Sequence, residues 1–275
     1  MSEFKFSEPS ALIEIELPDG RLIEGPRGRT LGEFLSILRP ELKSDLMGGI
    51  VNGELRELTY PVLRSKKVCP ITLEHPDGMI IYKRSLVFML AACFEKRFPG
   101  FDLEVKHSIN GGGILCNVSG PREFTRDDRQ ALESEMRKMM KADRPIVRRE
   151  VTLEEARLLF ERKNQSDKTD LLKYRKKPYL IIYELDDFQD YFYGYMLPST
   201  GCLKYFRLEN AGRSNQFLLR LPASGSNLQI GALEKYKRMR PIFEEYGSWQ
   251  KSLNIHMLSS INRAIDEMMA REGDA

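Results

Sequence analysis

Apolar and acidic side chains alternate from residue 11 to residue 17, a pattern that predicts a strand with one buried face. The turn-forming residues Pro18, Asp19 and Gly20 follow, and residues 21–24 return toward the start as a second strand. We therefore expect the chain to open with a β-hairpin.

A short helix is predicted next, because Thr30 and Glu33 have the spacing of a capping box and Pro40 would end the helix. Asn52 and Gly53 form a favoured hairpin turn after a short apolar run, and residues 68–73 read as the last strand. Strands with one covering helix make a small α+β unit.

The middle of the chain changes pattern. Residues 86–94 are apolar on almost every side, which predicts a helix buried between other elements. Residues 103–109 and 114–118 read as a strand pair around a glycine-rich turn. A helix is predicted from Thr125, with Leu132, Met136 and Met139 on its buried stripe.

The last part of the chain mixes both patterns. A capping box at Thr152 predicts a helix, and the polar residues 163–170 are expected to form a loop. We then expect strands at 179–185, 191–195, 203–208 and 217–221. Two closing helices are predicted from two apolar stripes, which are Ile242, Tyr246 and Trp249 in one and Leu258, Ile261, Ile265 and Met268 in the other.

Composition adds few constraints. The 275 residues suit two modest domains, and 41% hydrophobic residues are ample for their cores. No apolar run approaches the ~20 residues of a membrane-spanning helix, and the amino terminus lacks a secretory signal pattern. The four cysteines are scattered, so we expect buried, reduced thiols in a cytoplasmic protein. A net charge of +3 neither demands nor forbids a polyanionic partner.

Recognisable catalytic patterns are missing from the sequence. The glycines at 111–113 are not followed by the Lys-Ser/Thr of a phosphate-binding loop, so a tight turn is the better interpretation. The three histidines are not paired with another His or Cys at a metal-binding spacing. His107 stays a cleft candidate, although an ordinary strand or surface histidine is the favoured interpretation. We therefore predict no catalytic residues, no metal site and no cofactor in this chain.

Basic residues cluster around tyrosines in two places. Lys173, Arg175, Lys176 and Lys177 surround Tyr174, and a second cluster at 235–240 surrounds Tyr236. Cations that neutralise phosphates beside aromatic rings that stack on bases are typical of nucleic-acid binding. Solvated charge runs of this size are also common, so both interpretations stay open.

Three further stretches together resemble a known arrangement. Ile13–Gly20, Gly28–Phe34 and Gly49–Gly53 resemble the TGS domain, a β-grasp module at the front of threonyl-tRNA synthetase. Tyr82–Ala91 resembles the opening helix of that synthetase's editing domain, and Tyr191–Gly201 is similar to its second motif. The sequence of Tyr191–Gly201 also resembles the form of this motif that precedes the kinase domain in bacterial uridine-kinase-like nucleoside kinases.

The departures from this family bear on activity. The resemblance implies two histidines four residues apart on the opening helix and a Cys and a His in the second motif, where this chain has Arg84, Phe88, Phe192 and Met196. Arginine keeps its proton, phenylalanine has no lone pair and methionine alone does not rebuild a zinc site. Hydrolytic editing is therefore expected to be absent. Either the cleft is filled by packing around the two phenyl rings, which we favour, or Arg84 binds a phosphate or carboxylate.

The fold class predicted from these features is α+β. It comprises a TGS-like β-grasp domain at 1–72, a degenerate editing-like α+β domain at 73–230, and a helical connector at 231–275 toward a kinase domain that this chain lacks. The candidate residues of a ligand cleft are Arg84, Phe88, His107, Phe192, Tyr193, Met196 and Thr200. Lys173, Arg175, Lys176 and Lys177 are the candidate polyanion contacts.

The expected function is that of a non-catalytic ligand-binding or regulatory region, for nucleotide, nucleoside or RNA, of a uridine-kinase-like nucleoside kinase. ATP and Mg²⁺ would be bound only by the kinase domain, which is the expected partner. A residual aminoacyl-tRNA editing hydrolase and a structural dimerisation scaffold are the alternatives. We expect a cytoplasmic protein without a membrane partner, and a homo-oligomer remains open.

Overall fold

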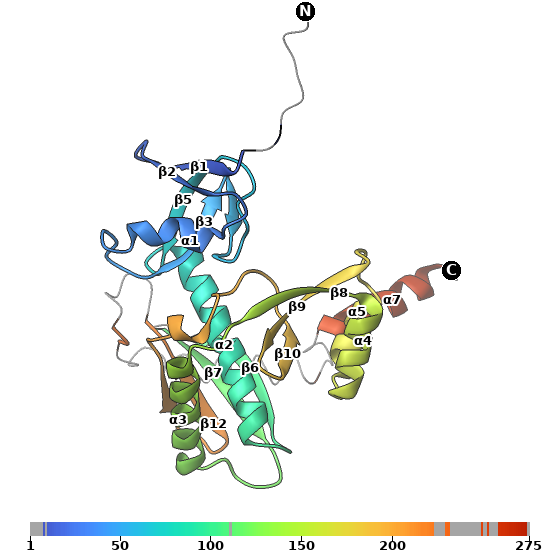
Figure 1. Cartoon of the computed structure of the whole chain (residues 1–275). Helices are drawn as coiled ribbons and strands as arrows, with labels where there is room; N and C mark the ends of the chain where they lie inside the picture. Colours follow the sequence, from blue (N-terminus) through green and yellow to red (C-terminus); the bar gives the residue numbers. More distant parts are fainter. Residues whose placement is uncertain are drawn as a thin grey trace, which may run out of the picture. The chain divides into compact units, whose positions relative to one another are not determined.

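A computed structural model describes residues 8, 10–109, 112–222, 229–231, 249, 252 and 258–273 of the protein (Figure 1). The chain divides into two compact units. The first comprises residues 1–147, 185–188 and 193–231, and the second comprises 148–184, 189–192 and 232–275. The fold is α+β, as the sequence predicts, and the described residues form three small sheets.

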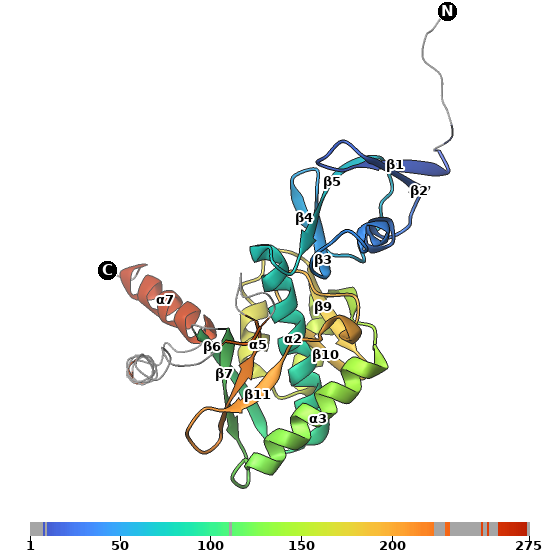
Figure 2. The ribbon, with the colours of Figure 1, turned by 90° about the vertical axis from the view of Figure 1, so that its left-hand side faces the viewer.

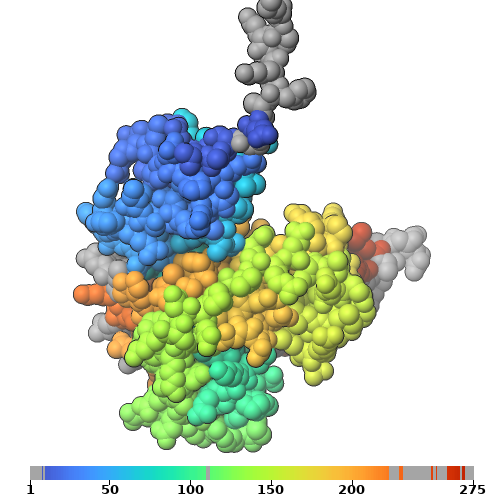
Figure 3. Space-filling model, viewed as in Figure 1, coloured from blue at the N-terminus to red at the C-terminus, as the bar shows by residue number. Residues whose placement is uncertain are grey.

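The first unit begins with a five-stranded sheet in the order β2-β1-β5-β3-β4, in which β1 and β5 are parallel. The blue residues of this segment form one continuous lobe in the space-filling view (Figure 3). Its strands and helix are β1 Leu12–Glu16, β2 Leu22–Pro26, α1 Leu31–Leu35, β3 Leu46–Val51, β4 Glu54–Arg56 and β5 Lys66–Thr72.

Two local predictions for this segment are confirmed. Thr30 and Glu33 form the capping box at the start of α1. Asn52 and Gly53 both have positive φ, 48° and 85°, as the turn between β3 and β4 requires. Ile15, Leu31 and Leu35 are fully buried in a core that the helix and the sheet share.

The rest of the first unit packs two helices beside a four-stranded antiparallel sheet in the order β11-β12-β7-β6 (Figures 1 and 2). Helices α2 and α3 contact each other, and α3 also contacts β11. These elements are α2 Pro76–Arg97, β6 Asp102–Ile109, β7 Gly113–Ser119, α3 Arg126–Ala142, β11 Arg207–Asn210 and β12 Gln216–Arg220.

Helix α2 is buried on most sides, as its apolar pattern predicts. Pro76 stands in its first turn and His75 caps it by accepting the amide of Asp77. Gly78 then allows a close approach, because a Cβ there would lie 2.0 Å from the Thr72 carbonyl oxygen. The predicted stripe of α3 is confirmed, since Leu132, Met136 and Met139 are buried.

The second unit contains a three-stranded sheet in the order β10-β9-β8 with short helices. Its core comprises the buried residues Val151, Ala156, Phe160, Leu180 and Ile182. The elements are β8 Val147–Thr152, α4 Leu153–Arg162, α5 Ser166–Leu172, β9 Tyr179–Leu185, β10 Phe188–Tyr191 and α7 Leu258–Gly273. The capping box at Thr152 and the last predicted helix are confirmed, whereas Ile242 and Tyr246 lie outside the described residues.

Three predictions of secondary structure are wrong. The expected loop at 163–170 contains most of α5, a helix without a buried residue, which therefore leaves no apolar stripe to detect. The expected strand 191–195 stops at Tyr191, because Gly194 has a φ of 101° that strand backbone does not adopt. The expected strand 203–208 begins only at Arg207, since the Leu203 amide still closes a turn onto Thr200.

Strand β8 was not predicted at all. Its sequence, VRREVT, exposes every side chain except Val151, so it lacks the alternation that marks a half-buried strand. Among the described helices, none is long and apolar enough to cross a membrane.

The cysteines differ in exposure, which gives a first testable prediction. All four are free thiols, and the expectation of burial holds for Cys93 and Cys116 but is wrong for Cys69, which is exposed. Burial raises the pKa of Cys93 to about 12 and that of Cys116 to about 12. With a thiol reagent such as DTNB at pH 8, we expect Cys69 to react first and the two buried thiols to react only on unfolding. The Cys69→Ser variant should remove the rapid phase, and a rapid phase that survives this change contradicts the assignment.

Candidate functional site

The candidate site lies where α2 meets the segment 193–197 of the same unit. Nη1 of Arg84 donates a hydrogen bond of 2.7 Å to the backbone carbonyl of Tyr195. Gly194 makes this possible, because a Cβ at that position would lie 2.6 Å from the guanidinium carbon of Arg84. Its φ of 101° is also a conformation that other residues rarely adopt. The glycine therefore lets the chain pass directly over the guanidinium group.

A second arginine reaches the same tyrosine. Nη1 of Arg56, which ends β4, donates to the Tyr195 hydroxyl at 2.9 Å. The Arg56 guanidinium carbon also lies 5.3 Å from the ring centroid of Tyr60, and the group is paired with Glu54. Tyr195 thus holds one guanidinium with its carbonyl and another with its hydroxyl. Both arginines are half-buried, an environment that strengthens their attraction for an anion.

Phe88, one turn further along α2, has a different environment. It is fully buried, and its ring centroid lies 5.1 Å from that of Phe188. Met196 is 1% exposed. Both side chains therefore contribute to the apolar core beside Arg84, and neither has a polar atom that could hold an ion in the way a carboxylate or imidazole does.

Ser85 is a positioning residue of this site that sequence reasoning missed. Its hydroxyl donates to the Ile81 carbonyl and accepts the Leu197 amide at 2.8 Å, so it fastens the segment to α2. A buried serine within an apolar helix is the signal that could have identified it, because a buried hydroxyl needs a partner.

Thr200 and Tyr193 lie at opposite extremes of exposure. Thr200 is fully buried, its hydroxyl donates to the Met139 carbonyl, and it accepts the Arg144 amide, each at 2.8 Å. These bonds fasten the end of α3. Tyr193 is 82% exposed and extends into solvent.

The two remaining cleft candidates are His107 and Phe192. His107 is half-buried on β6, where burial and the neighbouring Lys106 lower its pKa, so the ring favours its neutral form. Phe192 is half-buried and belongs to the second unit. Of the seven cleft candidates, Arg84, Phe88 and Met196 therefore come from adjoining parts of α2 and the segment beside it, and a ligand contact by any of the seven stays a prediction.

The predicted polyanion contacts lie after α5 in the second unit. Lys173 pairs with Asp170 at 2.7 Å, and Nε of Arg175 donates to the Tyr179 carbonyl. Lys176 and Lys177 are exposed, and the Lys177 amine lies 5.8 Å from the ring centroid of Tyr179. The ion pair and the backbone bond tie part of this cluster to its own surroundings, so Lys176 and Lys177 are the better polyanion candidates.

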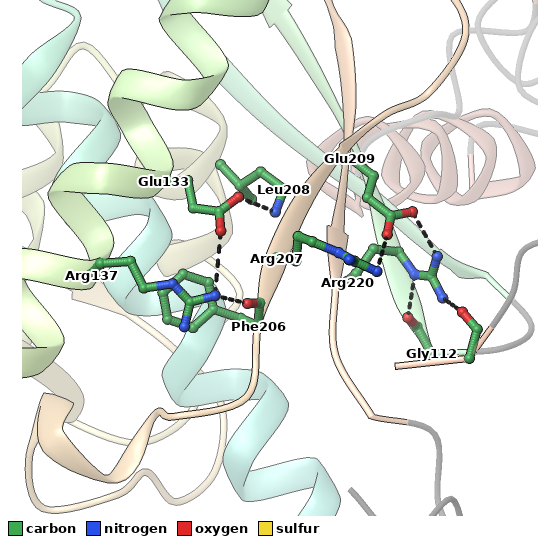
Figure 4. Close-up of polar contacts among 9 residues, drawn as sticks. Gly112, Glu133, Arg137, Phe206, Arg207, Leu208, Glu209 and Arg220 are labelled. Carbon is green, nitrogen blue, oxygen red and sulfur yellow. Dashed lines mark hydrogen bonds and ion pairs between the residues drawn. The ribbon is translucent and has the colours of Figure 1, made fainter. Parts of the chain in front are cut away.

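A further group of arginines, on α3, β11 and β12, was not predicted (Figure 4). The Arg137 guanidinium carbon lies 3.9 Å from the Phe206 ring centroid, and Arg137 also contacts Glu133. Arg220, only 1% exposed, donates to Glu209 and to the Gly112 carbonyl. The residues come from segments far apart in the sequence, so no local pattern marks them.

A metal site is not evident in the ranges that the structure describes, where no three His, Cys, Asp or Glu side chains lie close enough together to hold an ion. The site around Tyr195 instead offers guanidinium donors, which bind phosphate and carboxylate groups.

Comparison with known proteins adds to this description. No protein-family model matches the chain. The chain is similar to the N-terminal third of threonine–tRNA ligases. It is 30% identical over 200 residues to the enzyme of Symbiobacterium thermophilum, which covers 72% of this chain and 31% of that protein. For Thermotoga petrophila the identity is 32% over 198 residues, 71% of this chain and 30% of the relative.

The ligase of Streptococcus sanguinis is matched over a longer stretch, with 27% identity over 258 residues, 90% of this chain and 40% of the relative. The α+β fold of the chain agrees with the TGS and editing region of such enzymes. This chain spans about a third of the length of the curated relatives that it matches. The resemblance to threonyl-tRNA synthetase drawn from the sequence motifs is confirmed, whereas the resemblance to nucleoside kinases stays a prediction.

Proposed function

We propose that the chain is a non-hydrolytic binding module for a nucleotide, nucleoside or RNA end, derived from an editing region. The observation that supports this most is the pair of half-buried guanidinium groups of Arg84 and Arg56 on either side of Tyr195. Arginine in such a position can bind a phosphate oxygen with its remaining donors. The similarity to threonine–tRNA ligases makes a nucleic-acid ligand the natural candidate.

The same residues argue against hydrolysis. Hydrolysis of an aminoacyl ester needs a general base or a metal-bound water near the ester. The positions to which the family resemblance assigns such groups hold Arg84, Phe88 and Met196, and the last two are buried among apolar side chains. Arg84 remains protonated at any physiological pH and cannot act as a base.

Binding is tested by fluorescence anisotropy with labelled tRNA and by thermal shift with nucleosides and nucleotides. We expect tRNA or a nucleotide to bind, and Arg84→Gln and Arg56→Gln each to weaken binding by about tenfold or more, with a smaller salt dependence. Arg39→Gln, an exposed arginine in the N-terminal segment, is the control for charge alone. No binding by any of these ligands at millimolar concentration, or equal losses in all three variants, contradicts the proposal.

Hydrolysis is tested separately with mischarged tRNA, which should stay intact in the presence of the purified chain. Deacylation above the buffer rate that disappears in Arg84→Gln contradicts the non-hydrolytic assignment and favours a residual editing hydrolase.

The proposal also includes regulation of a nucleoside kinase domain, in the same or a partner chain. It is supported by the form of Tyr191–Gly201 and by the exposed stripe Ile261, Ile265 and Met268 on α7, which would cover a partner's surface. ATP and Mg²⁺ would bind only to that domain. An assay of ATP-dependent nucleoside phosphorylation on the native protein from its source tests this part, and the absence of such activity contradicts it.

A further inference from the structure

A separate hollow of about 480 Å³ is lined by Arg137, Phe206 and Arg207, but a smaller one at the start of α3 has the stronger concentration of cations. This second hollow has a volume of about 320 Å³. Arg126 and Arg129 line it from the first turns of α3, and Arg213 lines it from the turn between β11 and β12. It lies in the first unit and uses none of the residues of the site around Tyr195.

The two walls of this hollow are held in a fixed relation. The side-chain oxygen of Asn215 accepts the Phe124 amide at 2.6 Å, and its backbone carbonyl accepts the Val118 amide at 2.8 Å. Asn215 has a φ of 58°, which the short polar side chain tolerates. The Gly212 amide donates to the side chain of Asn210 within the same turn. The arginines are therefore presented by a preorganised backbone, which reduces the entropic cost of binding.

Two acidic residues near the hollow, Asp128 and Glu209, are already engaged. Asp128 accepts two hydrogen bonds from Arg122, at 2.5 and 3.0 Å, and these together with bonds from Thr125 lower its pKa. Glu209 is paired with Arg207 and Arg220. Glu123, in contrast, lines the hollow and would oppose a bound anion.

The N-terminal end of helix α3 contributes little to the attraction for an anion. Thr125 accepts the Asp128 amide, and the Asp128 carboxylate accepts the Thr125 amide, so the capping box already uses two of the amides of this turn. The charge that attracts an anion comes from the three guanidinium groups.

We propose that this hollow binds a terminal phosphate group, either of a free nucleotide or of an RNA with a 5′-phosphate. Three arginines can neutralise a phosphate monoester and bind its oxygens in pairs. Ser214 and Gln216, which also line the hollow, add donors and acceptors for the attached sugar or base. The volume leaves room for more than inorganic phosphate, which suits a nucleotide end.

The experiment measures affinity by isothermal titration calorimetry for inorganic phosphate, AMP and adenosine, and by anisotropy for one oligoribonucleotide with and without its 5′-phosphate. The test variant combines Arg126→Gln, Arg129→Gln and Arg213→Gln. The control variant combines Arg27→Gln, Arg39→Gln and Arg64→Gln, three exposed arginines elsewhere in the unit, so that both lose the same charge. Melting temperatures of both variants confirm that they are folded.

We expect AMP to bind at least about tenfold more tightly than adenosine, and the test variant to lose this difference while the control variant keeps it. Glu123→Gln should tighten AMP binding, because it removes the opposing carboxylate. If AMP binds no better than adenosine, or if the test and control variants lose affinity equally, the proposal is overturned. If AMP binds but the 5′-phosphate does not tighten binding of the oligonucleotide, the site is assigned to free nucleotides. If the 5′-phosphate tightens binding of the oligonucleotide more than the phosphate of AMP tightens binding over adenosine, the site is assigned to RNA ends.

This inference fails independently of the proposed function. Binding that depends on Arg84 and not on Arg126, Arg129 and Arg213 would overturn the second site and leave the first in place. Binding that depends on Arg126, Arg129 and Arg213 and not on Arg84 would support the second site and contradict the first.

Discussion

Replacing Arg220 with methionine is expected to lower the free energy of unfolding by about 3 kcal/mol. The Arg220 side chain is only 1% exposed, and its guanidinium group donates to the carbonyls of Gly112 and Gly231 and to Glu209. Methionine fills much of the same volume but donates to none of these partly buried acceptors, so each of them loses a hydrogen bond. This loss of stability lies at the low end of the range for a broken buried ion pair, because Glu209 still forms an ion pair with Arg207 in the variant.

Arg207 supplies a matched control, since it pairs with the same carboxylate from an exposed position. Its side chain is 55% exposed, and Arg207→Met should cost at most about 1 kcal/mol. Urea unfolding followed by circular dichroism measures both variants. Equal losses for Arg207→Met and Arg220→Met would mean that the burial of Arg220 contributes nothing to stability.

Arg220 also shows where sequence reasoning reaches its limit. Nothing in the run of residues 216–221 distinguishes a buried arginine from one at the end of an exposed strand. Its partner Glu209 lies on β11 and its partner Gly112 lies in the turn just before β7, and the pairing of β12 with β7 and β11 brings them together. A contact of this kind follows from topology rather than from local pattern.

Local chemistry, in contrast, was readable. The capping boxes at Thr30 and Thr152 and the Asn52-Gly53 turn depend only on near neighbours in the chain, and all three are present. The apolar run within α2 predicted a buried helix because so many apolar residues on all sides can be covered only from several directions.

The candidate site was predicted only in part. The position of Arg84 followed from a family resemblance, but its contact with the Tyr195 carbonyl depends on the positive φ of Gly194, which the sequence does not reveal. Arg56 was missed altogether, because it lies in a hairpin far along the chain from Tyr195 and only the fold brings the two side chains together.

The second large effect is expected at Phe88. Replacing Phe88 with alanine should lower the free energy of unfolding by about 3–5 kcal/mol, the range for a buried phenyl ring whose removal leaves a cavity. The ring is fully buried and packs on Phe188 at 5.1 Å between centroids. Thermal unfolding measures the loss, and Tyr193→Ala, at an 82% exposed position, should change stability by less than about 0.5 kcal/mol.

Phe88 also separates packing from ligand binding at this position. Phe88→Leu keeps an apolar side chain and should recover part of the stability that alanine loses, because less volume is removed. If Phe88 only packs, the affinity of the folded fraction for tRNA or nucleotide should match that of the unmodified protein in Phe88→Leu. Unchanged stability together with lost affinity would show instead that the ring contacts ligand, and that the space beside Arg84 is open to it.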